Sequence, residues 1–278
     1  MKWNIVIDSS SDLTAADAKG DIGLDIVPLT IIVGEKEFRD DENLDVQSLL
    51  QAMKEEKRAS SSACPSTEDF YSCFAKADNS ICITMTGALS GTFNSARLAK
   101  EMLMEEHPEK RVHIIDSKAT AGKMVLLKMK AEELIEKGLE FDVISNMLDE
   151  YCKNTNLVFA LGGYDNLIKT GRMSVLAGIM ATHLGIRAVA VGTPEGEIDV
   201  VKKPRGERSA IEVMVDIMKQ KKPMKDQPVV ISHCRNPIGA RNAKALIMEK
   251  LDTDKVTILD CKGLTTFYTM EKGLIIGY

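Results

Sequence analysis

The sequence predicts a protein of two α/β domains, the first of which has a mostly parallel sheet flanked by helices. Short apolar runs alternate along the 278-residue chain with longer stretches of helical periodicity, which is the pattern of βαβ units. Many of these runs end in Asp, Ser or Gly, where a strand would meet a loop. Hydrophobic residues make up 44% of the chain and charged residues 28%, proportions typical of a globular protein.

In the first half of the chain, apolar runs predict strands over 2–8, 24–33, 80–85 and 111–116. Helical periodicity predicts helices over 44–57, 67–77, 96–106, 118–138 and 142–154. Asp45 is placed to cap the first helix, and Ser66 with Asp69 is close to a capping box for the second. Gly34 marks a turn into a short polar return strand, and the Ser/Pro segment 59–67 is predicted as a loop.

A boundary near residue 155 divides the chain into an N-terminal domain over 1–155 and a C-terminal domain over 156–278. In the second domain we predict strands over 156–162, 227–233 and 255–260, helices over 164–171, 206–220 and 242–251, and a hairpin over 187–203. Residues 172–185 are apolar on nearly every side, which predicts a helix buried all round. The tail, 263–278, is short, apolar and punctuated by glycine.

Composition and motifs exclude several classes of function. The net charge of −5 argues against bulk binding to nucleic acid or to an anionic membrane. No apolar run reaches the roughly 18 residues that span a bilayer, and Asp8 interrupts the start of the chain before a secretory core could form. The six cysteines show neither C-x-x-C nor zinc-finger spacing, so we expect reduced thiols, a cytoplasmic protein, and neither a metal nor a cofactor.

The segment 87–95, GALSGTFNS, lies between a predicted strand and a predicted helix and raises two interpretations of Ser90. As a nucleophile, Ser90 would need a base, and His233 is the histidine best placed to face a cleft, at a strand end. The glycine order does not match the G-x-S-x-G elbow of α/β-hydrolases. An esterase or acyl transferase that uses Ser90 therefore stays as an alternative.

The second interpretation of this turn is an anion site. Backbone N–H groups at the start of the helix, together with the hydroxyls of Ser90, Thr92 and Ser95, suit a carboxylate or a phosphate. A plain helix cap by Ser90 or Thr92 fits the local pattern equally well. The chain has neither a Walker A loop nor a dinucleotide fingerprint, so ATP and NAD have no support.

Other polar groups follow predicted strands, at 8–11, 60–62 and 116–117, and parallel strands would gather them at one edge of the sheet. Arg172 and Arg205 lie in basic loops, where they are either solvated surface charges or part of a docking patch or a clamp for an acidic head group. The apolar helix predicted around 173–184 suits ordinary core packing, and a lipid tunnel is the special case.

Seven stretches in the same order give the chain a resemblance to the DegV family of bacterial fatty-acid-binding proteins. They are IVIDSSSDL, SACPST, LSGTFNSA, IIDSKATAG, LIKTGRMS, KKPRGERSA and the closing GLIIGY. The resemblance covers the whole chain, and it implies two α/β domains with a long-chain fatty acid in a tunnel between them. It also implies a non-catalytic carrier that presents the acyl carboxylate to a fatty acid kinase catalytic subunit, which makes an acyl-phosphate for phospholipid synthesis.

The resemblance also assigns roles to individual residues. The carboxylate would be held by Ser90 and Ser62, with help from Gly91, Thr92 and Tyr268. The tunnel would be lined by Met173, Leu176, Ile179 and Met180, and the kinase would dock at Arg172 and Arg205.

The chain departs from the family pattern in three places. Tyr268 stands where relatives usually have His, and a neutral tyrosine donates one hydrogen bond but supplies no cation. Ala63 and Cys64 replace a Ser-Gln pair, and Pro204 precedes Arg205. These departures bear on head-group affinity and ligand identity, and a binder of another small anion, or anionic lipid, stays as a further alternative.

Overall fold

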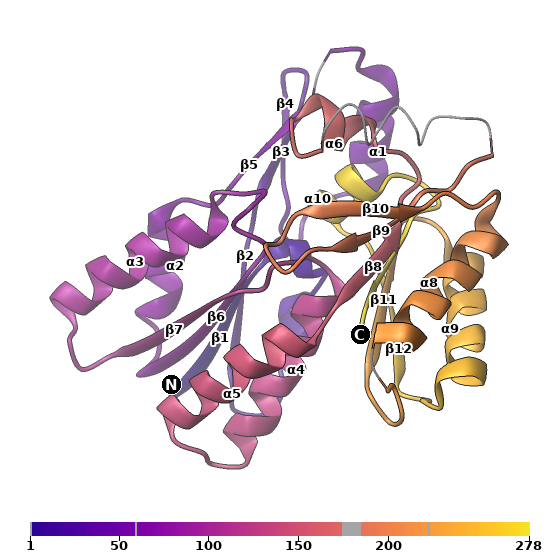
Figure 1. Ribbon diagram of the computed structural model, residues 1–278. Coiled ribbons are helices and arrows are strands. Elements are labelled where there is room, and N and C mark those ends of the chain that lie inside the picture. The colour runs from indigo at the N-terminus through magenta and orange to yellow at the C-terminus, as the bar shows by residue number, and fades with distance from the viewer. Residues whose placement is uncertain (1, 59, 174–184, 222) are drawn as a thin grey trace.

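The computed structural model describes residues 2–58, 60–173, 185–221 and 223–278. Figure 1 shows two larger sheets side by side, each with its own flanking helices, and a small sheet above them. The N-terminal sheet is wholly parallel in the order β2-β1-β6-β7. Its strands are β1 (Trp3–Asp8), β2 (Gly23–Val27), β6 (Asn79–Thr84) and β7 (Arg111–Asp116). The predicted parallel sheet is thereby confirmed.

Helices cover both faces of this sheet, as its two-sided burial requires. One face packs against α2 (Thr67–Phe74) and α3 (Thr92–Glu106). The other face packs against α4 (Gly122–Glu136) and α5 (Phe141–Asn154). Two short 3₁₀ turns, Ser9–Ser11 and Ala15–Asp17, follow β1.

The C-terminal sheet has the order β10-β9-β8-β13-β11-β12, and its pairs are antiparallel except for β11 with β12. Its strands are β8 (Leu157–Ala160), β9 (Val189–Gly192), β10 (Ile198–Lys202), β11 (Val229–His233), β12 (Val256–Asp260) and β13 (Leu274–Gly277). One face is covered by α8 (Glu207–Lys221) and α9 (Pro237–Leu251). The last strand of the chain therefore lies in the middle of this sheet.

The helix α4 lies between the two larger sheets (Figure 1). It packs against β1 and β6 of the N-terminal sheet and against β11 and β13 of the C-terminal one. Two glycines permit this close approach, because a Cβ on Gly122 would lie 2.5 Å from the carbonyl oxygen of Val230 and one on Gly277 would lie 2.3 Å from the Gly122 carbonyl carbon. The proposed division at residue 155 lies between α5 and β8.

The apolar run 24–33, predicted as a single strand, forms two. Strand β2 ends at Val27, and β3 (Thr30–Val33) belongs to a separate small sheet with β4 (Lys36–Arg39) and β5 (Ser61–Ala63). Pro28 stands between the two strands and has no N–H for a ladder. The loop predicted over 59–67 was therefore wrong at 61–63, because the edge of β3 supplies pairing partners for these residues.

For the remaining helices, some sequence predictions are confirmed and others are corrected. Helix α1 (Val46–Glu55) is capped by Asp45, and Ser66 and Asp69 form the capping box of α2. Helix α4 begins at Gly122 rather than at 118, because Lys118 and Ala121 have positive φ values of 54° and 50°. The short helices are α6 (Asp165–Lys169) and α10 (Gly263–Thr269). The sequence did not reveal α10, and most of the buried helix predicted over 172–185 lies outside the described residues.

Candidate functional site

A cavity of about 330 Å³ lies between the N-terminal and C-terminal sheets. This volume is in the range of small-molecule sites. Most of its wall is apolar, with side chains from both halves of the chain: Leu29, Met85, Leu89, Leu157, Phe159, Leu161, Leu167, Ile198, Leu264 and Ile275. Its polar side chains are Ser62, Thr86, Ser90, Lys118, Thr120, Arg172, Glu197, Thr265, Tyr268 and Thr269.

Two of the predicted head-group residues meet in one wall of this cavity. The Ser62 hydroxyl on β5 and the Tyr268 hydroxyl on α10 are 2.9 Å apart, within hydrogen-bond distance. Tyr268 also packs edge-on against Phe267, with ring centroids 4.7 Å apart, so its ring is held in place. The pair joins residues 206 positions apart in the sequence.

The turn at 87–95 brings Ser90 to the same cavity. The Ser90 Oγ is 2.8 Å from the Thr92 Oγ1 and accepts a 3.3 Å hydrogen bond from the Thr92 backbone N–H. Ser90 therefore supports the start of α3 and lines the cavity at the same time. Gly91 also lines the cavity, whereas Thr92 is fully buried and is not one of its lining residues.

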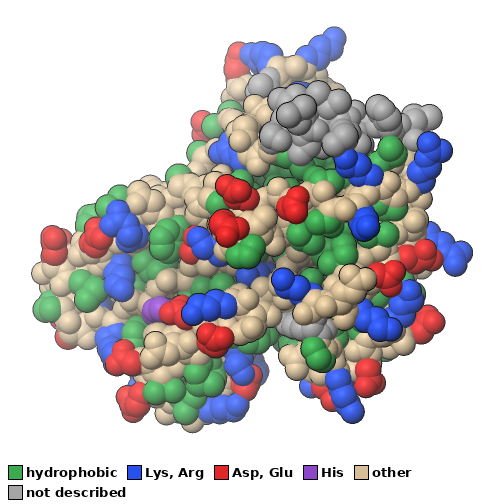
Figure 2. Space-filling model, viewed as in Figure 1, with side chains coloured by type: hydrophobic (Ala, Val, Ile, Leu, Met, Phe, Trp, Pro, Cys, Tyr) green, Lys and Arg blue, Asp and Glu red, His purple; other side chains and the backbone are tan. Residues whose placement is uncertain are grey.

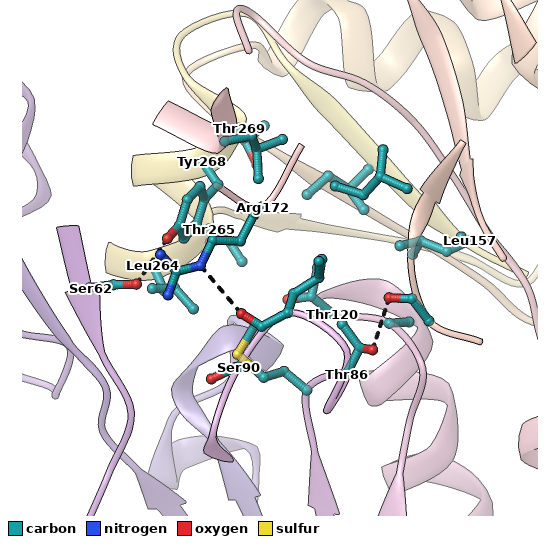
Figure 3. A pocket seen from close by; sticks show the side chains of 18 of the residues that line it. Ser62, Thr86, Ser90, Thr120, Leu157, Arg172, Leu264, Thr265, Tyr268 and Thr269 are labelled. Carbon is teal, nitrogen blue, oxygen red and sulfur yellow. Dashed lines mark hydrogen bonds between the residues drawn. The ribbon is translucent and has the colours of Figure 1, made fainter. Parts of the chain in front are cut away.

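Arg172 approaches this turn from the C-terminal half. Its Nε donates to the carbonyl oxygen of Leu89 at 3.3 Å and its Nη1 to that of Thr170 at 2.8 Å. Figure 3 shows Arg172 between Tyr268 and the Ser90 turn, on the same side of the cavity as Ser62 and opposite Leu157. Ser62, Ser90, Arg172 and Tyr268 thus lie together at one side of the cavity, whereas Thr86 lies toward Leu157.

Two other predicted site residues, Met173 and Arg205, lie apart from this group. Arg205 is exposed and is not among the residues that line the cavity. Met173 is buried with Tyr164 and Leu167 in a neighbouring core cluster. The three remaining residues predicted to line a tunnel lie outside the described residues: Leu176, Ile179 and Met180.

No histidine among the described residues lines the cavity. His233 is buried, and its Nδ1 accepts a 3.3 Å hydrogen bond from the backbone N–H of Asn236. His113 pairs instead with Asp149 at 2.9 Å. Ser90 therefore has no neighbouring histidine base in the described part of the chain, and a serine nucleophile needs one to be activated in the usual way.

Three buried carboxylates stabilise the walls of the cavity. The Asp8 Oδ2 accepts a 2.6 Å hydrogen bond from the N–H of Met85, and burial raises the pKa of Asp8 to about 6. The Asp40 side chain accepts from the N–H groups of Gly263 and Leu264 at 2.7 and 2.9 Å. The Asp12 Oδ1 accepts from Lys262 N–H at 2.9 Å and from the Thr265 hydroxyl.

Sequence reasoning identified Asp8 as a polar strand end but missed Asp12 and Asp40. Their targets in α10 lie 223 to 253 residues away, so no local spacing reveals them. Burial raises the pKa of Asp12 to about 7, and it also raises the pKa of Asp40.

The surface and the helices are the features that bear on binding to a membrane. Figure 2 shows acidic and basic side chains interspersed over the face in view, with exposed hydrophobic side chains between them. In the parts of the chain that the structure describes, none of the helices combines the length and the apolar character needed to cross a bilayer.

Comparison with known proteins gives matches over the whole chain. A family model described as "Uncharacterised protein, DegV family" matches residues 2–276. A DegV domain-containing protein of Streptococcus pyogenes serotype M1 is 36% identical over 279 residues, which cover 100% of this chain and 99% of the relative. A DegV domain-containing protein of Streptococcus gordonii shows the same identity and coverage.

Solved structures show the same fold. The Fatty Acid Kinase (Fak) B3 protein of Streptococcus pneumoniae, loaded with linoleic acid, has a TM-score of 0.95 and 34% identity, over 100% of this chain and 99% of that one. A DegV family protein from Eubacterium eligens, loaded with heptadecanoic acid, has a TM-score of 0.94 and 28% identity, over 99% and 98% of the two chains. These similarities confirm the predicted fold class and the predicted resemblance to the DegV family.

Proposed function

The chain belongs to the DegV family, and on that premise we propose that it is a carrier for a long-chain fatty acid. The observation that carries the proposal is the chemistry of the cavity: its wall is mostly apolar, and the hydroxyls of Ser62, Ser90 and Tyr268 lie together with the Arg172 guanidinium at one side. The solved relatives that contain linoleic and heptadecanoic acid support the ligand class.

The apolar wall would supply most of the binding energy. Burial of each CH₂ group contributes about 0.8 kcal/mol, so a chain of about 16 carbons could gain on the order of 10 kcal/mol before the costs of association. Such a chain is poorly soluble in water, and an apolar cavity that shelters it would allow its transfer through solution. The polar side then has to orient the carboxylate more than to add affinity.

The head group would lie among Ser62, Tyr268 and Ser90. A buried carboxylate must accept hydrogen bonds or take up a proton, and the hydroxyls of these three residues can each turn a proton toward it. Arg172 lies beside the Ser90 turn and adds positive charge at the same side. Thr92 would act indirectly, through its contact with the Ser90 hydroxyl.

The carrier would not itself react with the fatty acid, because among the described residues no histidine reaches Ser90. We propose that it presents the carboxylate to a separate kinase subunit that docks near Arg172 and Arg205. The Fak B3 relative supports a kinase partner, and Arg205 is exposed to solvent beside the start of α8.

Mass spectrometry of lipid extracted from the purified protein tests the ligand. We expect close to one fatty acid per chain, and stoichiometric rebinding of an added long-chain acid after delipidation. Absence of both would refute the carrier proposal.

Covalent labelling of Ser90 by a fluorophosphonate probe, lost in His233→Ala, would favour the esterase alternative instead.

Acyl-phosphate formation by a fatty acid kinase catalytic subunit tests the docking role. Arg205→Ala should reduce this rate at least tenfold, since exposed arginines at an interface can carry much of the binding energy. It should leave fatty acid affinity unchanged, because Arg205 does not line the cavity. Arg208→Ala is the matched control, since Arg208 is another highly exposed arginine in the same region. Equal rates of acyl-phosphate formation with Arg205→Ala and with Arg208→Ala would exclude a specific role of Arg205 in docking.

A further inference from the structure

Helix α10 begins without a cap from its own sequence. Its N-cap residue, Lys262, makes no side-chain capping hydrogen bond, and the first N–H groups of a helix have no partner within the helix. Those of Gly263 and Leu264 donate instead to the two carboxylate oxygens of Asp40, at 2.7 and 2.9 Å. The N–H of Lys262 donates to Asp12 at 2.9 Å. Two carboxylates from the first 40 residues of the chain thus cap a helix that lies close to the C-terminus of the chain.

The fit between Asp40 and this helix leaves no spare room. A Cβ on Gly263 would lie 2.5 Å from the Asp40 Oδ1 and 2.5 Å from the Leu44 Cδ2. Asp40 is itself only 2% exposed, so its side chain cannot swing aside into solvent. A carboxylate also interacts favourably with the positive end of the helix dipole. The contact therefore fixes where α10 begins.

Helix α10 supplies a large part of one cavity wall. Leu264, Thr265, Tyr268 and Thr269 all line the cavity. Since the helix has only seven residues, a shift at its first turn would move the Tyr268 hydroxyl by a similar amount.

Asp40 also belongs to the sheet that carries Ser62. It follows β4 directly, and its own N–H donates to the carbonyl oxygen of Leu29 at 2.8 Å. Strands β4 and β5 both pair with β3, and Ser62 on β5 lies opposite Ile31. One small sheet therefore holds Ser62 directly and Tyr268 through Asp40.

We propose that Asp40, assisted by Asp12, is a positioning residue that sets the Ser62–Tyr268 hydroxyl pair and thereby the preference of the cavity for a carboxylate head group. The inference rests on the proposed function, because it concerns the ligand of that cavity. Asp40 and Asp12 act through α10 and are not themselves among the residues that line the cavity.

The test measures selectivity rather than affinity alone. Dissociation constants are measured for oleic acid and for oleyl alcohol, which share a chain and differ in the head group. Asp40→Ala should lower the preference for the acid by about five- to tenfold, the loss expected when a hydrogen bond to a charged group is misplaced. Alcohol affinity should stay within about twofold of the wild type, since the apolar wall supplies it. A merely structural role for Asp40 would weaken both ligands together.

Asp45→Ala is the matched control. Asp45 caps α1 with the same chemistry, accepting from the N–H groups of Gln47 and Ser48 at 3.0 and 3.3 Å. Helix α1 contributes no residue to the cavity wall, so this variant should keep the wild-type preference. The same loss of preference in Asp45→Ala would overturn the inference.

A double-mutant cycle identifies the route of the effect. In a Tyr268→Phe background the hydroxyl is already absent, so Asp40→Ala should lower the preference no further. Additive losses would show that Asp40 does not act through Tyr268. If Asp40→Ala does not fold, Asp40→Asn replaces it, because the amide retains one acceptor and loses the other.

The outcomes separate the two proposals. Wild-type protein that binds neither ligand contradicts the carrier function itself. Wild-type protein that prefers the acid, together with an unchanged preference in Asp40→Ala and Asp40→Asn, contradicts only the positioning role.

Discussion

Single residues around the cavity show how burial changes the role of a side chain. Asp8, Asp12 and Asp40 are acids that are buried almost completely and that accept hydrogen bonds from distant backbone N–H groups. Their burial disfavours the charged form, and the hydrogen bonds partly offset that cost. Through these hydrogen bonds the three acids contact Met85 and the start of α10, which belong to the cavity wall.

The buried Asp12 predicts an unusual dependence of stability on pH. Burial raises its pKa from 3.8 to about 7, helped by the charge of Asp40 and opposed by hydrogen bonds from Thr265 and Lys262. The folded protein therefore holds this proton more tightly than the unfolded chain does. The stabilising contribution is full below about pH 4 and is lost as the pH rises through about 7.

The Asp12→Asn variant isolates this effect, because the amide resembles the protonated acid. Between pH 5 and pH 8 the free energy of unfolding of the wild type should fall by about 2 kcal/mol relative to the variant. Urea denaturation at the two pH values measures the difference. A constant difference between the two proteins would contradict the raised pKa of Asp12.

Tyr268 gives a second prediction at this scale. In Tyr268→Phe the Ser62 hydroxyl loses the partner that it contacts at 2.9 Å, while the ring packing remains. We expect fatty acid binding to weaken by about five- to tenfold, the effect of one hydrogen bond to a charged group, and fatty alcohol binding to change little. Isothermal titration with both ligands checks this, and equal losses for the two would remove Tyr268 from the head-group site.

At the scale of elements, the two helices that reach the polar side of the cavity begin in different ways. Helix α3 begins at a turn in which Ser90 accepts the N–H of Thr92, so its start is encoded within a few residues. The start of α10 depends on Asp40 and on the absence of a side chain at Gly263. Helix α3 was predicted from the sequence, although it begins at Thr92 rather than at 96, and α10 was not predicted.

Gly263→Ala tests the dependence of α10 on its distant cap. The new Cβ would lie 2.5 Å from the Asp40 Oδ1, so the helix start must move. We expect a loss of about 1 to 3 kcal/mol in the free energy of unfolding, as for overpacking in a core, and weaker fatty acid binding. Gly192→Ala is the control for stability alone, because its nearest contacts would lie at 3.6 Å and beyond but Gly192 itself lines the cavity. Wild-type stability in Gly263→Ala would show that the contact is not tight.

At the scale of the whole molecule, α4 connects the two larger sheets, and the cavity lies where they meet. Each half contributes both hydroxyls and apolar side chains, with Ser90 and Leu29 from one half and Tyr268 and Phe159 from the other. The cavity is therefore a property of the assembled chain, and its integrity depends on the contact between the halves.

Gly122→Ala should weaken that contact. Its Cβ would lie 2.5 Å from the Val230 carbonyl oxygen and 2.8 Å from the Gly277 nitrogen, both of which are backbone atoms in β-strands. Because backbone in a sheet cannot yield as a side chain can, we expect a loss of about 3 kcal/mol or more. Thermal unfolding measures it, and a change below about 0.5 kcal/mol would indicate that the two halves adjust freely.

Ligand binding should stabilise the assembled molecule. A ligand that binds only the folded state at about 100 times its Kd adds about 2.7 kcal/mol, which for a chain of this size raises the Tm by about 5 °C. Oleic acid should produce this shift in delipidated protein and acetate should not, since acetate lacks the chain that the apolar wall binds. Equal shifts from both acids would favour a site for small anions.

The sequence predicted more of the fold than of the site. The hairpin of β9 and β10, the cap of α1 and the range of β7 followed from local patterns. The turn at Ser90 was recognisable, and the structure places Ser90 at the start of α3 and in the cavity wall at once. That this turn holds a ligand stays a prediction. The assignment of Ser62 and Tyr268 came from the family resemblance rather than from spacing.

The sequence by itself determined the alternation of strands and helices, because apolar periodicity and capping residues act over a few positions. It also determined family membership, through motifs spread over the whole chain. Only the tertiary structure decided that the apolar run 24–33 separates into two sheets, that Ser62 meets Tyr268, and that Asp40 caps α10. These contacts join residues far apart in the chain, and their energies depend on burial and distance, which appear only when the chain is folded.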